Sequence, residues 1–268
     1  MIDYTEHLIT STDGAKIAYI TFGNGRPFVI SHGGFTVADE WFETARALSA
    51  KRQVAIIERR GRGRSGDAET HSLEQEIDDL AAVVDDLGGN ADLFGHSYGG
   101  ALSLGYALRT GFDGKLILYE PTTAMAALVG GAKLGPVQKL FDQGEIDKSQ
   151  ELLYTSVLRI PVSEIEVFRK SPAWDHHRSH LATFLREVKA LDGFAPTIEA
   201  CATLKARIAF LLGSMADQWT RDNAGAFVQR IAGITLLPVR GQSHFAHLTN
   251  PKMLAELTDA ALDMLSED

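Results

Sequence analysis

A serine with a glycine two residues away on each side stands in the segment "ADLFGHSYGGALSLGYALRTG", residues 91–111. An apolar run ends just before Ser97, and a helical pattern begins just after it. A tight turn from strand to helix forces its central residue into a strained backbone and lifts the side chain clear of the sheet. The residues at positions 95 and 99 then have to be small, as Gly95 and Gly99 are, because they pack against the neighbouring strand and helix. The pattern predicts that Ser97 is a nucleophile.

A nucleophilic serine needs a base, and histidine suits that role near neutral pH. Of the nine histidines, His244 in "VRGQSHFAHLTNP" lies between the last expected strand and the final expected helix. That loop belongs to the same sheet edge as Ser97, so we predict His244 as the base. His247 is the second candidate, and it is expected instead to be a polar residue in a partly buried helix start.

The transition state of acyl transfer also needs hydrogen-bond donors for a developing oxyanion. The segment "SHGGFT" follows the expected strand at 27–31. We predict that the backbone amides of Gly34 and Tyr98 form the oxyanion hole, with the loop residue uncertain by one. Gly33 and Phe35, in the same loop, are predicted to contact the substrate.

The elements that must position these residues alternate along the chain. Short apolar runs without polar alternation are typical of strands buried on both faces, and a hairpin precedes them at 6–10 and 16–22. Helical patterns lie between the runs, which predicts an α/β fold with a mainly parallel sheet and helices on both faces. The expected buried strands are 27–31, 53–58, 91–95, 115–120, 207–213 and 235–239.

One interval breaks this alternation. Between Glu120 and Arg207 only helical patterns occur, which predicts a helical insertion over the carboxyl ends of the strands. Aromatic residues of this insertion, Trp174 among them, would wall a pocket above the serine. His176 and His180 lie four residues apart beside Asp175, but no metal site is expected there because a fixed carboxylate or cysteine partner is missing.

Four segments, "SHGG", "ERRGRGRSGD", "GHSYGG" and "GQSHFAHLTNP", occur in an order and spacing that resemble the α/β-hydrolase fold superfamily. The resemblance implies an eight-stranded, mostly parallel sheet with strand 2 antiparallel and a cap inserted after strand 6. Residues 1–121 and 199–268 would form the core, and 122–198 the helical cap. The arginines of the second segment would be structural or would line the rim of the site.

The resemblance also leaves two candidates for the acid of a Ser-His-acid triad. The usual position follows strand 7, where Asp217 stands one residue beyond the expected spacing. The other position is the end of strand 6, where Glu120 stands; some haloalkane dehalogenases and lactonases similar to zearalenone hydrolase use a glutamate there. A charged residue that ends a buried strand needs a partner to offset desolvation. We therefore favour Glu120 over Asp217.

Composition narrows the class of protein. The 268 residues carry a formal net charge of −9, which argues against a nucleic-acid partner. The single cysteine, Cys201, excludes an internal disulfide and fits a reducing compartment. No signal peptide or membrane-length apolar stretch is found. We expect a cytoplasmic protein that does not act at membranes.

These observations predict a serine hydrolase that cleaves a small-molecule carboxylic ester or lactone through an acyl-enzyme, without a cofactor. A homodimer is a candidate assembly. Carbon–carbon bond hydrolysis or cofactor-free perhydrolysis would use the same triad, and a non-catalytic ligand receptor on the same fold is the alternative from another class.

Overall fold

The computed structural model describes residues 3–160 and 162–266. Its centre is an eight-stranded sheet in the order β1-β2-β4-β3-β5-β6-β7-β8, in which β2 runs antiparallel to both of its neighbours and the strands from β3 onward are parallel. This confirms the predicted α/β-hydrolase topology. The strands are β1 (Tyr4–Thr10), β2 (Lys16–Phe22), β3 (Pro27–Ser31), β4 (Gln53–Glu58), β5 (Asp92–His96), β6 (Lys115–Tyr119), β7 (Arg207–Gly213) and β8 (Thr235–Val239).

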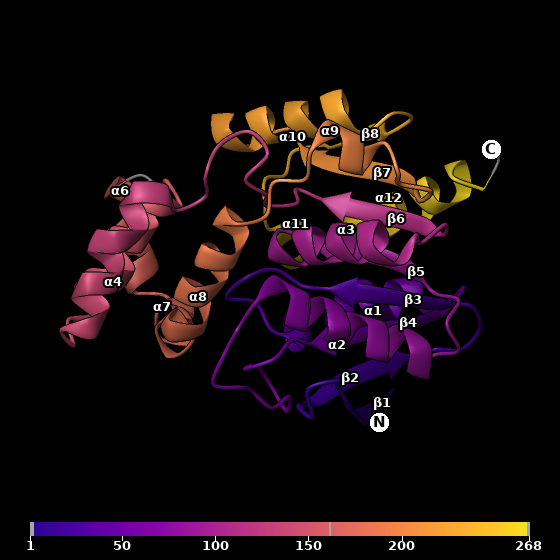
Figure 1. Ribbon diagram of the computed structural model, residues 1–268, viewed down its shortest axis with the longest axis horizontal. Helices are drawn as coiled ribbons and strands as arrows, with labels where there is room; N and C mark the ends of the chain where they lie inside the picture. Colours follow the sequence, from indigo (N-terminus) through magenta and orange to yellow (C-terminus); the bar gives the residue numbers. More distant parts are fainter. Residues whose placement is uncertain (1–2, 161, 267–268) are drawn as a thin grey trace.

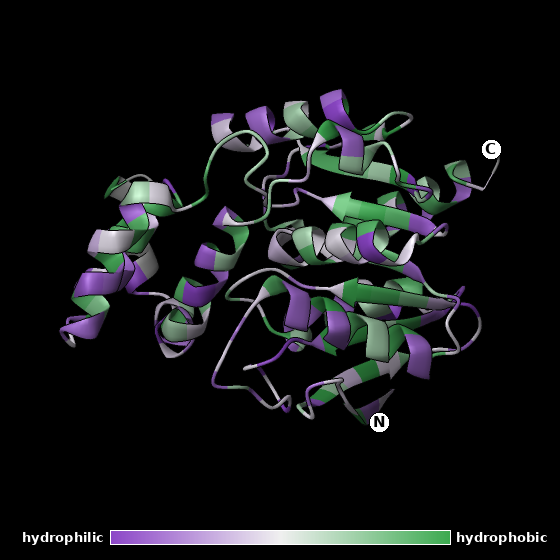
Figure 2. Ribbon diagram, viewed as in Figure 1, coloured by the Kyte–Doolittle hydropathy of each residue, from purple (hydrophilic) through white to green (hydrophobic). Residues whose placement is uncertain are grey.

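The parallel strands are buried on both faces, which is why their sequences read as continuous apolar runs. In β3, Val29 faces one hydrophobic cluster while Phe28 and Ile30 face the other. Figure 2 shows the strands as largely apolar and the outer helix faces as more polar. Alternate residues of each strand therefore anchor helices on opposite faces.

One face of the sheet is covered by α2 (Leu73–Asp86), α3 (Tyr98–Thr110) and α10 (Gln218–Arg230), and the other by α1 (Phe42–Leu48) and α12 (Pro251–Met264). Two of these helices begin at a capping side chain: Ser72 Oγ accepts from Gln75 N, and Asn250 Oδ1 accepts from Met253 N. A side-chain oxygen at this position satisfies an amide that the helix itself leaves free. Shorter helices are η1 (Ala38–Trp41), α9 (Ile198–Cys201) and α11 (Ala246–Thr249).

The interval between β6 and β7 is helical, as expected. In Figure 1, α4, α6, α7 and α8 gather on one side of the molecule, beyond the edge toward which the strand arrows point. We call this helical group the cap; the boundaries 122–198 stay a prediction. Its elements are η2 (Gly131–Lys133), α4 (Leu134–Asp142), α5 (Ile146–Leu152), the π-helical turn η3 (Leu153–Val157), α6 (Val162–Arg169), α7 (Pro172–Ser179) and α8 (Leu181–Asp192).

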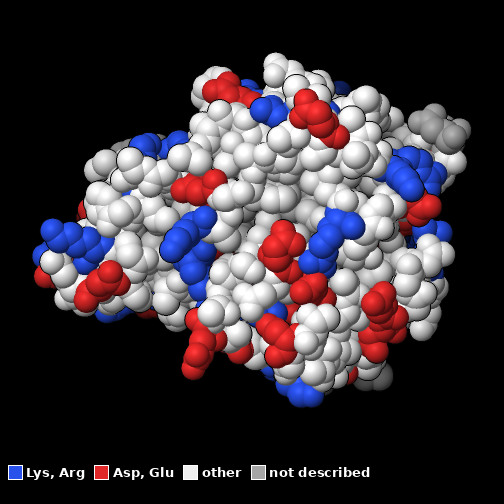
Figure 3. Space-filling view, in the orientation of Figure 1, with Lys and Arg blue, Asp and Glu red and all other residues white. Residues whose placement is uncertain are grey.

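The arginines that follow β4 are structural, and the expectation that they line a rim is wrong for three of them. Arg59, Arg60 and Arg62 are almost fully buried, and each is paired with buried carboxylates. On the face that Figure 3 shows, the remaining basic side chains lie in small groups beside acidic ones. Within residues 3–160 and 162–266, no helix combines the length and the apolar character needed to cross a membrane.

Candidate active site

Ser97 lies between β5 and α3 with φ 54° and ψ −118°, a strained conformation for a residue with a side chain. The neighbouring glycines are required by close packing. A Cβ on Gly99 would overlap the backbone of Ser31 in β3, and a Cβ on Gly95 would lie 2.6 Å from Gly100 Cα. The turn therefore has the geometry that the sequence predicts for an exposed serine.

The loop after β6 wraps around this turn. Ser97 N donates to Tyr119 O over 3.1 Å, and Thr122 N donates to Ser97 O over 2.9 Å. The Ser97 hydroxyl lies 3.2 Å from Thr122 Oγ1 and shares a hydrogen bond with it. Among the described residues, this is the side-chain partner of Ser97 Oγ, and no hydrogen bond joins it to His244.

Glu120 and His244 form a polar contact in which the carboxylate is buried and the imidazole is partly exposed. His244 Nδ1 lies 2.7 Å from Glu120 Oε2, and the Glu120 side chain is only 1% exposed. Its other oxygen, Oε1, accepts from Gly213 N at the end of β7 over 2.8 Å. A buried carboxylate with these partners is an acceptor, so Nδ1 of a neutral His244 ring carries the proton and Nε2 is left as the basic atom.

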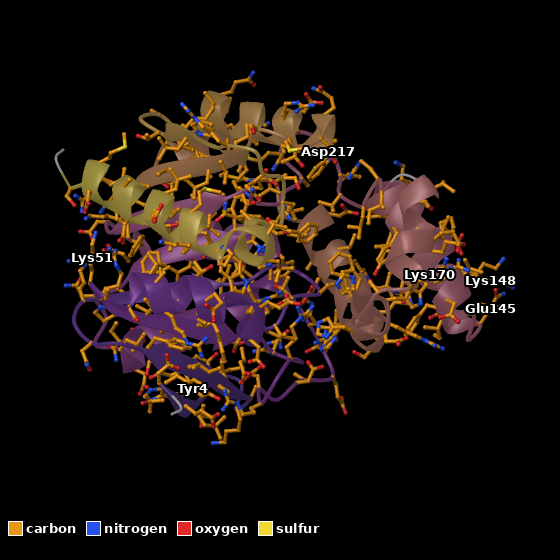
Figure 4. The ribbon with its side chains drawn as sticks, turned by 180° about the vertical axis from the view of Figure 1, so that it is seen from behind. Tyr4, Lys51, Glu145, Lys148, Lys170 and Asp217 are labelled. Atoms are coloured by element: carbon orange, nitrogen blue, oxygen red, sulfur yellow. The ribbon has the colours of Figure 1, made fainter. Side chains whose placement is uncertain are left out.

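Asp217, the alternative acid, is an exposed residue at the beginning of α10. Its Oδ1 accepts from Thr220 N over 2.7 Å, which makes it the N-cap of that helix. Figure 4 places Asp217 beside that end of α10. The structure thus pairs Glu120, and not Asp217, with His244, while the catalytic role of Glu120 stays a prediction.

The loop that carries His244 is held by residues that the sequence analysis did not select. His96 Nε2 donates to His244 O over 2.9 Å, and the Tyr119 hydroxyl donates to Ser243 O. The sequence offered one feature by which they could have been selected, namely their position: His96 directly precedes Ser97, and Tyr119 directly precedes Glu120. These two side chains fix the backbone on which His244 sits.

His247 is packed against Trp41 and forms no hydrogen bond with Ser97 among the described residues. It lies in α11, is 1% exposed, and stacks on Trp41 with a centroid distance of 4.4 Å and an interplanar angle of 2°. Burial, together with the nearby His244, lowers the pKa of His247 to about 3. The ring is therefore neutral near pH 7 and serves packing.

The loop after β3 runs beside the serine. A Cβ on Gly33 would come within 3.1 Å of Ser97 Cβ, so this glycine lies directly against the turn. The next residue, Gly34, accepts from Thr36 N through its carbonyl. Its own N–H has no acceptor within the described part of the chain, as an oxyanion-hole amide would require. The Tyr98 amide is among the first of α3, where amides lack partners inside the helix.

Two of the predicted substrate contacts are packed against the cap. Phe35, with φ 58°, stacks on Phe184 at 3.9 Å and on His177 at 4.3 Å. Trp174 meets Tyr154 edge-on at 5.5 Å, inside the cap. Phe35 therefore joins the loop after β3 to the cap, whereas Trp174 packs within the cap; contact of either with a substrate stays a prediction.

The cap histidines form packing contacts as well. His176 Nε2 donates to Phe35 O over 2.8 Å, which joins α7 to the loop after β3. His180 Nδ1 lies 2.9 Å from His176 O. In the described residues no group of three histidine, cysteine or acidic side chains is arranged to hold a metal ion.

Comparison with known proteins agrees with this architecture. Residues 28–257 match the model of the alpha/beta hydrolase family, and the chain therefore belongs to that family of hydrolase enzymes. It is 35% identical over 107 residues to a non-heme haloperoxidase from Rhodococcus erythropolis, a match that covers 38% of this chain and 39% of that protein. The chain thus matches less than half the length of this curated relative.

Solved structures show the same fold at low sequence identity. An alpha/beta hydrolase from Sphaerobacter thermophilus DSM 20745 has a TM-score of 0.82 at 24% identity, covering 95% of this chain and 99% of that one. The enol-lactonase from Burkholderia xenovorans LB400 has a TM-score of 0.72 at 17% identity, covering 96% and 100%.

Gly99→Ala should destabilise the protein, because the new methyl group would overlap the backbone of β3, which cannot move aside as a flexible side chain can. We expect the free energy of unfolding in urea to fall by about 1–3 kcal/mol. Gly225→Ala in α10 is the matched control, since nothing lies within 4 Å of its added Cβ. It should be neutral or stabilise by up to about 1 kcal/mol. Equal effects of the two changes would contradict the packing argument.

His247→Phe should make the protein less sensitive to acid. An unfolded histidine binds its proton near pH 6.5, whereas folded His247 has a pKa of about 3. Between these values the unfolded state binds more protons, so stability falls as the pH falls, by roughly 1.4 kcal/mol per pH unit. Phenylalanine can stack on Trp41 but does not titrate. The drop in unfolding free energy from pH 7 to pH 5, measured with urea, should be about 2 kcal/mol smaller in the variant; an unchanged drop would rule the account out.

Proposed function

We propose that this protein is a serine hydrolase that cleaves a small-molecule carboxylic ester or lactone. The single observation that carries the proposal is the hydrogen bond of 2.7 Å between His244 Nδ1 and the buried carboxylate of Glu120. It leaves Nε2 of His244 as a base at the edge where Ser97 stands on its strained turn. Ser97, His244 and Glu120 together supply the nucleophile, the base and the acid of a triad.

The reaction begins when the Ser97 hydroxyl exchanges Thr122 for His244 Nε2 by rotating about its Cα–Cβ bond. Its oxygen then attacks the carbonyl carbon while the proton passes to Nε2, and the amides of Gly34 and Tyr98 bind the oxyanion. His244 returns that proton to the leaving alkoxide, which departs as an alcohol, or stays attached in the case of a lactone. Water, deprotonated by His244, cleaves the acyl-enzyme, and Ser97 recovers its proton.

The negative charge of Glu120 acts during the steps in which His244 is protonated. The imidazolium of His244 exists only while the tetrahedral intermediate exists, and a buried carboxylate beside it stabilises the pair more strongly than an exposed one would. Gly213 N–H keeps the carboxylate in place without neutralising it. The role of Glu120 is therefore to orient the ring and stabilise its charged form.

The character of the substrate is inferred from the aromatic residues of the cap. The cap presents aromatic rings, among them Phe184 against the loop after β3, which favours a partly hydrophobic substrate of moderate size. A solved structure of the same fold is an enol-lactonase. A fold does not fix a substrate, so the substrate class rests on the site.

Perhydrolysis is the second candidate, and the similarity to a non-heme haloperoxidase is the observation that favours it. The two reactions share the acyl-enzyme. They differ in the acceptor, since hydrogen peroxide in place of water gives a peracid and free Ser97.

A fluorophosphonate probe should label the protein, and Ser97→Ala should abolish the labelling, because the probe phosphonylates an activated serine. Ser103→Ala is the matched control: Ser103 is fully buried in α3, a few residues beyond the turn, and labelling should persist. Labelling is read by mass spectrometry. An unlabelled wild-type protein would favour the ligand receptor, and labelling that survives in Ser97→Ala would contradict the assignment of the nucleophile.

Glu120→Gln should lower kcat for a simple aryl ester by about 10³-fold or more, because an amide neither stabilises the imidazolium nor fixes the tautomer of His244. Asp217→Asn should stay within about threefold of the wild type, since asparagine is also a good N-cap. Steady-state kinetics of both variants measures this. A large loss in Asp217→Asn with little change in Glu120→Gln would transfer the acid role to Asp217.

A further inference from the structure

Four charged side chains form a buried network next to the candidate site. Arg59 and Arg62 follow β4, Glu76 lies on α2, and Glu187 lies on the cap helix α8; all four are at most 2% exposed. Glu187 Oε1 accepts from Arg59 Nη2 over 2.5 Å and from Arg62 Nη1 over 2.6 Å. Arg59 Nε also donates to Glu76 Oε2 over 2.8 Å. A residue of the cap is thus locked between two arginines of the core.

Stability alone does not account for this network. Removing four charges from water is costly, and apolar residues of the same volume would hold the cap as well or better. Arg60, the next residue, is bidentate to Asp79, with both hydrogen bonds at 2.7 Å, and also donates to Asp13 and to Gln75 O. None of these partners belongs to the cap or to the loop after β3. The additional contacts of Arg59, which unlike those of Arg60 lie next to the candidate site, therefore need another explanation.

Those additional partners belong to the predicted oxyanion hole. Arg59 Nη1 donates to Gly33 O over 3.0 Å, and the Arg59 guanidinium lies 4.0 Å above the centre of the Tyr98 ring. Gly33 O and Gly34 N belong to one peptide group, and no peptide bond in the described chain is cis. In a trans peptide the C=O and N–H point in opposite directions. Arg59 shares this carbonyl with His32 Nδ1, at 2.9 Å, and with Thr36 Oγ1, at 3.0 Å. The three donors together fix the direction of the Gly34 N–H, and Arg59 is the one that also binds Glu187 of the cap.

Helix α8 contacts the same peptide a second time. Phe184, one turn before Glu187, occupies the space that a side chain on Gly34 would need. The same ring stacks on Phe35 at 3.9 Å. One face of α8 thus presses on the loop after β3 through Phe184 and holds Arg59 through Glu187.

We propose that Arg59 and Glu187 are positioning residues that make the direction of the Gly34 N–H depend on the seating of α8. The inference rests on the proposed function, because it assigns a purpose to the oxyanion hole of that reaction. Cap and oxyanion hole then act as one unit: acyl transfer is fast when α8 is seated and slow when it is displaced. The network would affect the transition state, whose oxyanion needs this N–H, and leave the binding of the substrate ground state unchanged.

The test measures Arg59→Lys and Glu187→Gln. The control is Arg60→Lys, which makes the same change as Arg59→Lys at a buried ion pair one residue away. The readouts are kcat and KM for an aryl ester and the inhibition constant of phenylboronic acid, whose tetrahedral adduct with a serine places an oxygen in an oxyanion hole. Loss of one oxyanion donor costs about 10²–10³-fold in kcat. For a misdirected donor we expect a fall of about 10–100-fold, with KM within about threefold and boronic acid binding weakened in the same proportion.

Two outcomes overturn the inference while the wild type remains an active esterase. In one, Arg59→Lys loses no more kcat than Arg60→Lys; in the other, the loss falls on KM, as expected for a merely structural role. A wild type without ester turnover contradicts the proposed function, and the inference with it.

A further variant decides the question if the charge variants do not fold. Thr36 Oγ1 donates to the same Gly33 O over 3.0 Å, and Thr36→Val removes this bond while leaving no charge unpaired. We expect kcat to fall by about 5–20-fold at constant KM. A folded Thr36→Val protein with wild-type kcat would show that the donors on Gly33 O do not set the rate, which removes the premise on which the roles of Arg59 and Glu187 rest.

Discussion

A carboxylate buried at the end of a central strand constrains this edge of the molecule more than any other group. The Glu120 side chain is 1% exposed, so its charge needs partners that compensate for lost water. One is an N–H from the end of β7, and the other is the imidazole of His244. Glu120 itself has φ 41°, a strained backbone conformation. The hydrogen bonds from Gly213 and His244 help to hold it there.

The same constraint explains the surrounding loops. Pro121 and Thr122 turn the chain back over Ser97, and Asn223 of α10 donates to Pro121 O over 2.6 Å. His96 and Tyr119 fix the loop that brings His244 to the carboxylate. The turn at Ser97, the Glu120 carboxylate and the loop of His244 are thus parts of one hydrogen-bonded unit, although they come from three separate segments of the chain.

A second group of buried charges, around Arg59 and Glu187, joins the core to the cap. The contrast with Glu120 is instructive, because Arg59 has two carboxylates and a carbonyl as partners and is therefore fixed in every direction. Such networks are expensive to bury and strongly destabilising to break. Their value lies in geometry: a rigid guanidinium can hold a cap helix and a loop at one distance.

The sequence by itself determined the features that depend on neighbouring residues. Apolar runs located the strands because burial on both faces leaves no polar alternation, and the glycines around Ser97 identified the turn because a tight backbone crossing admits no side chain. The tertiary structure decided which side chains pair with each other.

Spacing along the chain left both Glu120 and Asp217 as candidates for the partner of His244. Only the folded structure shows that Glu120 lies against His244 while Asp217 caps α10. In the same way, no local pattern joins Glu187 to Arg59 across 128 residues. Local propensity sets the backbone of a short segment, whereas the partner of a buried charge is set by which segments the sheet brings together.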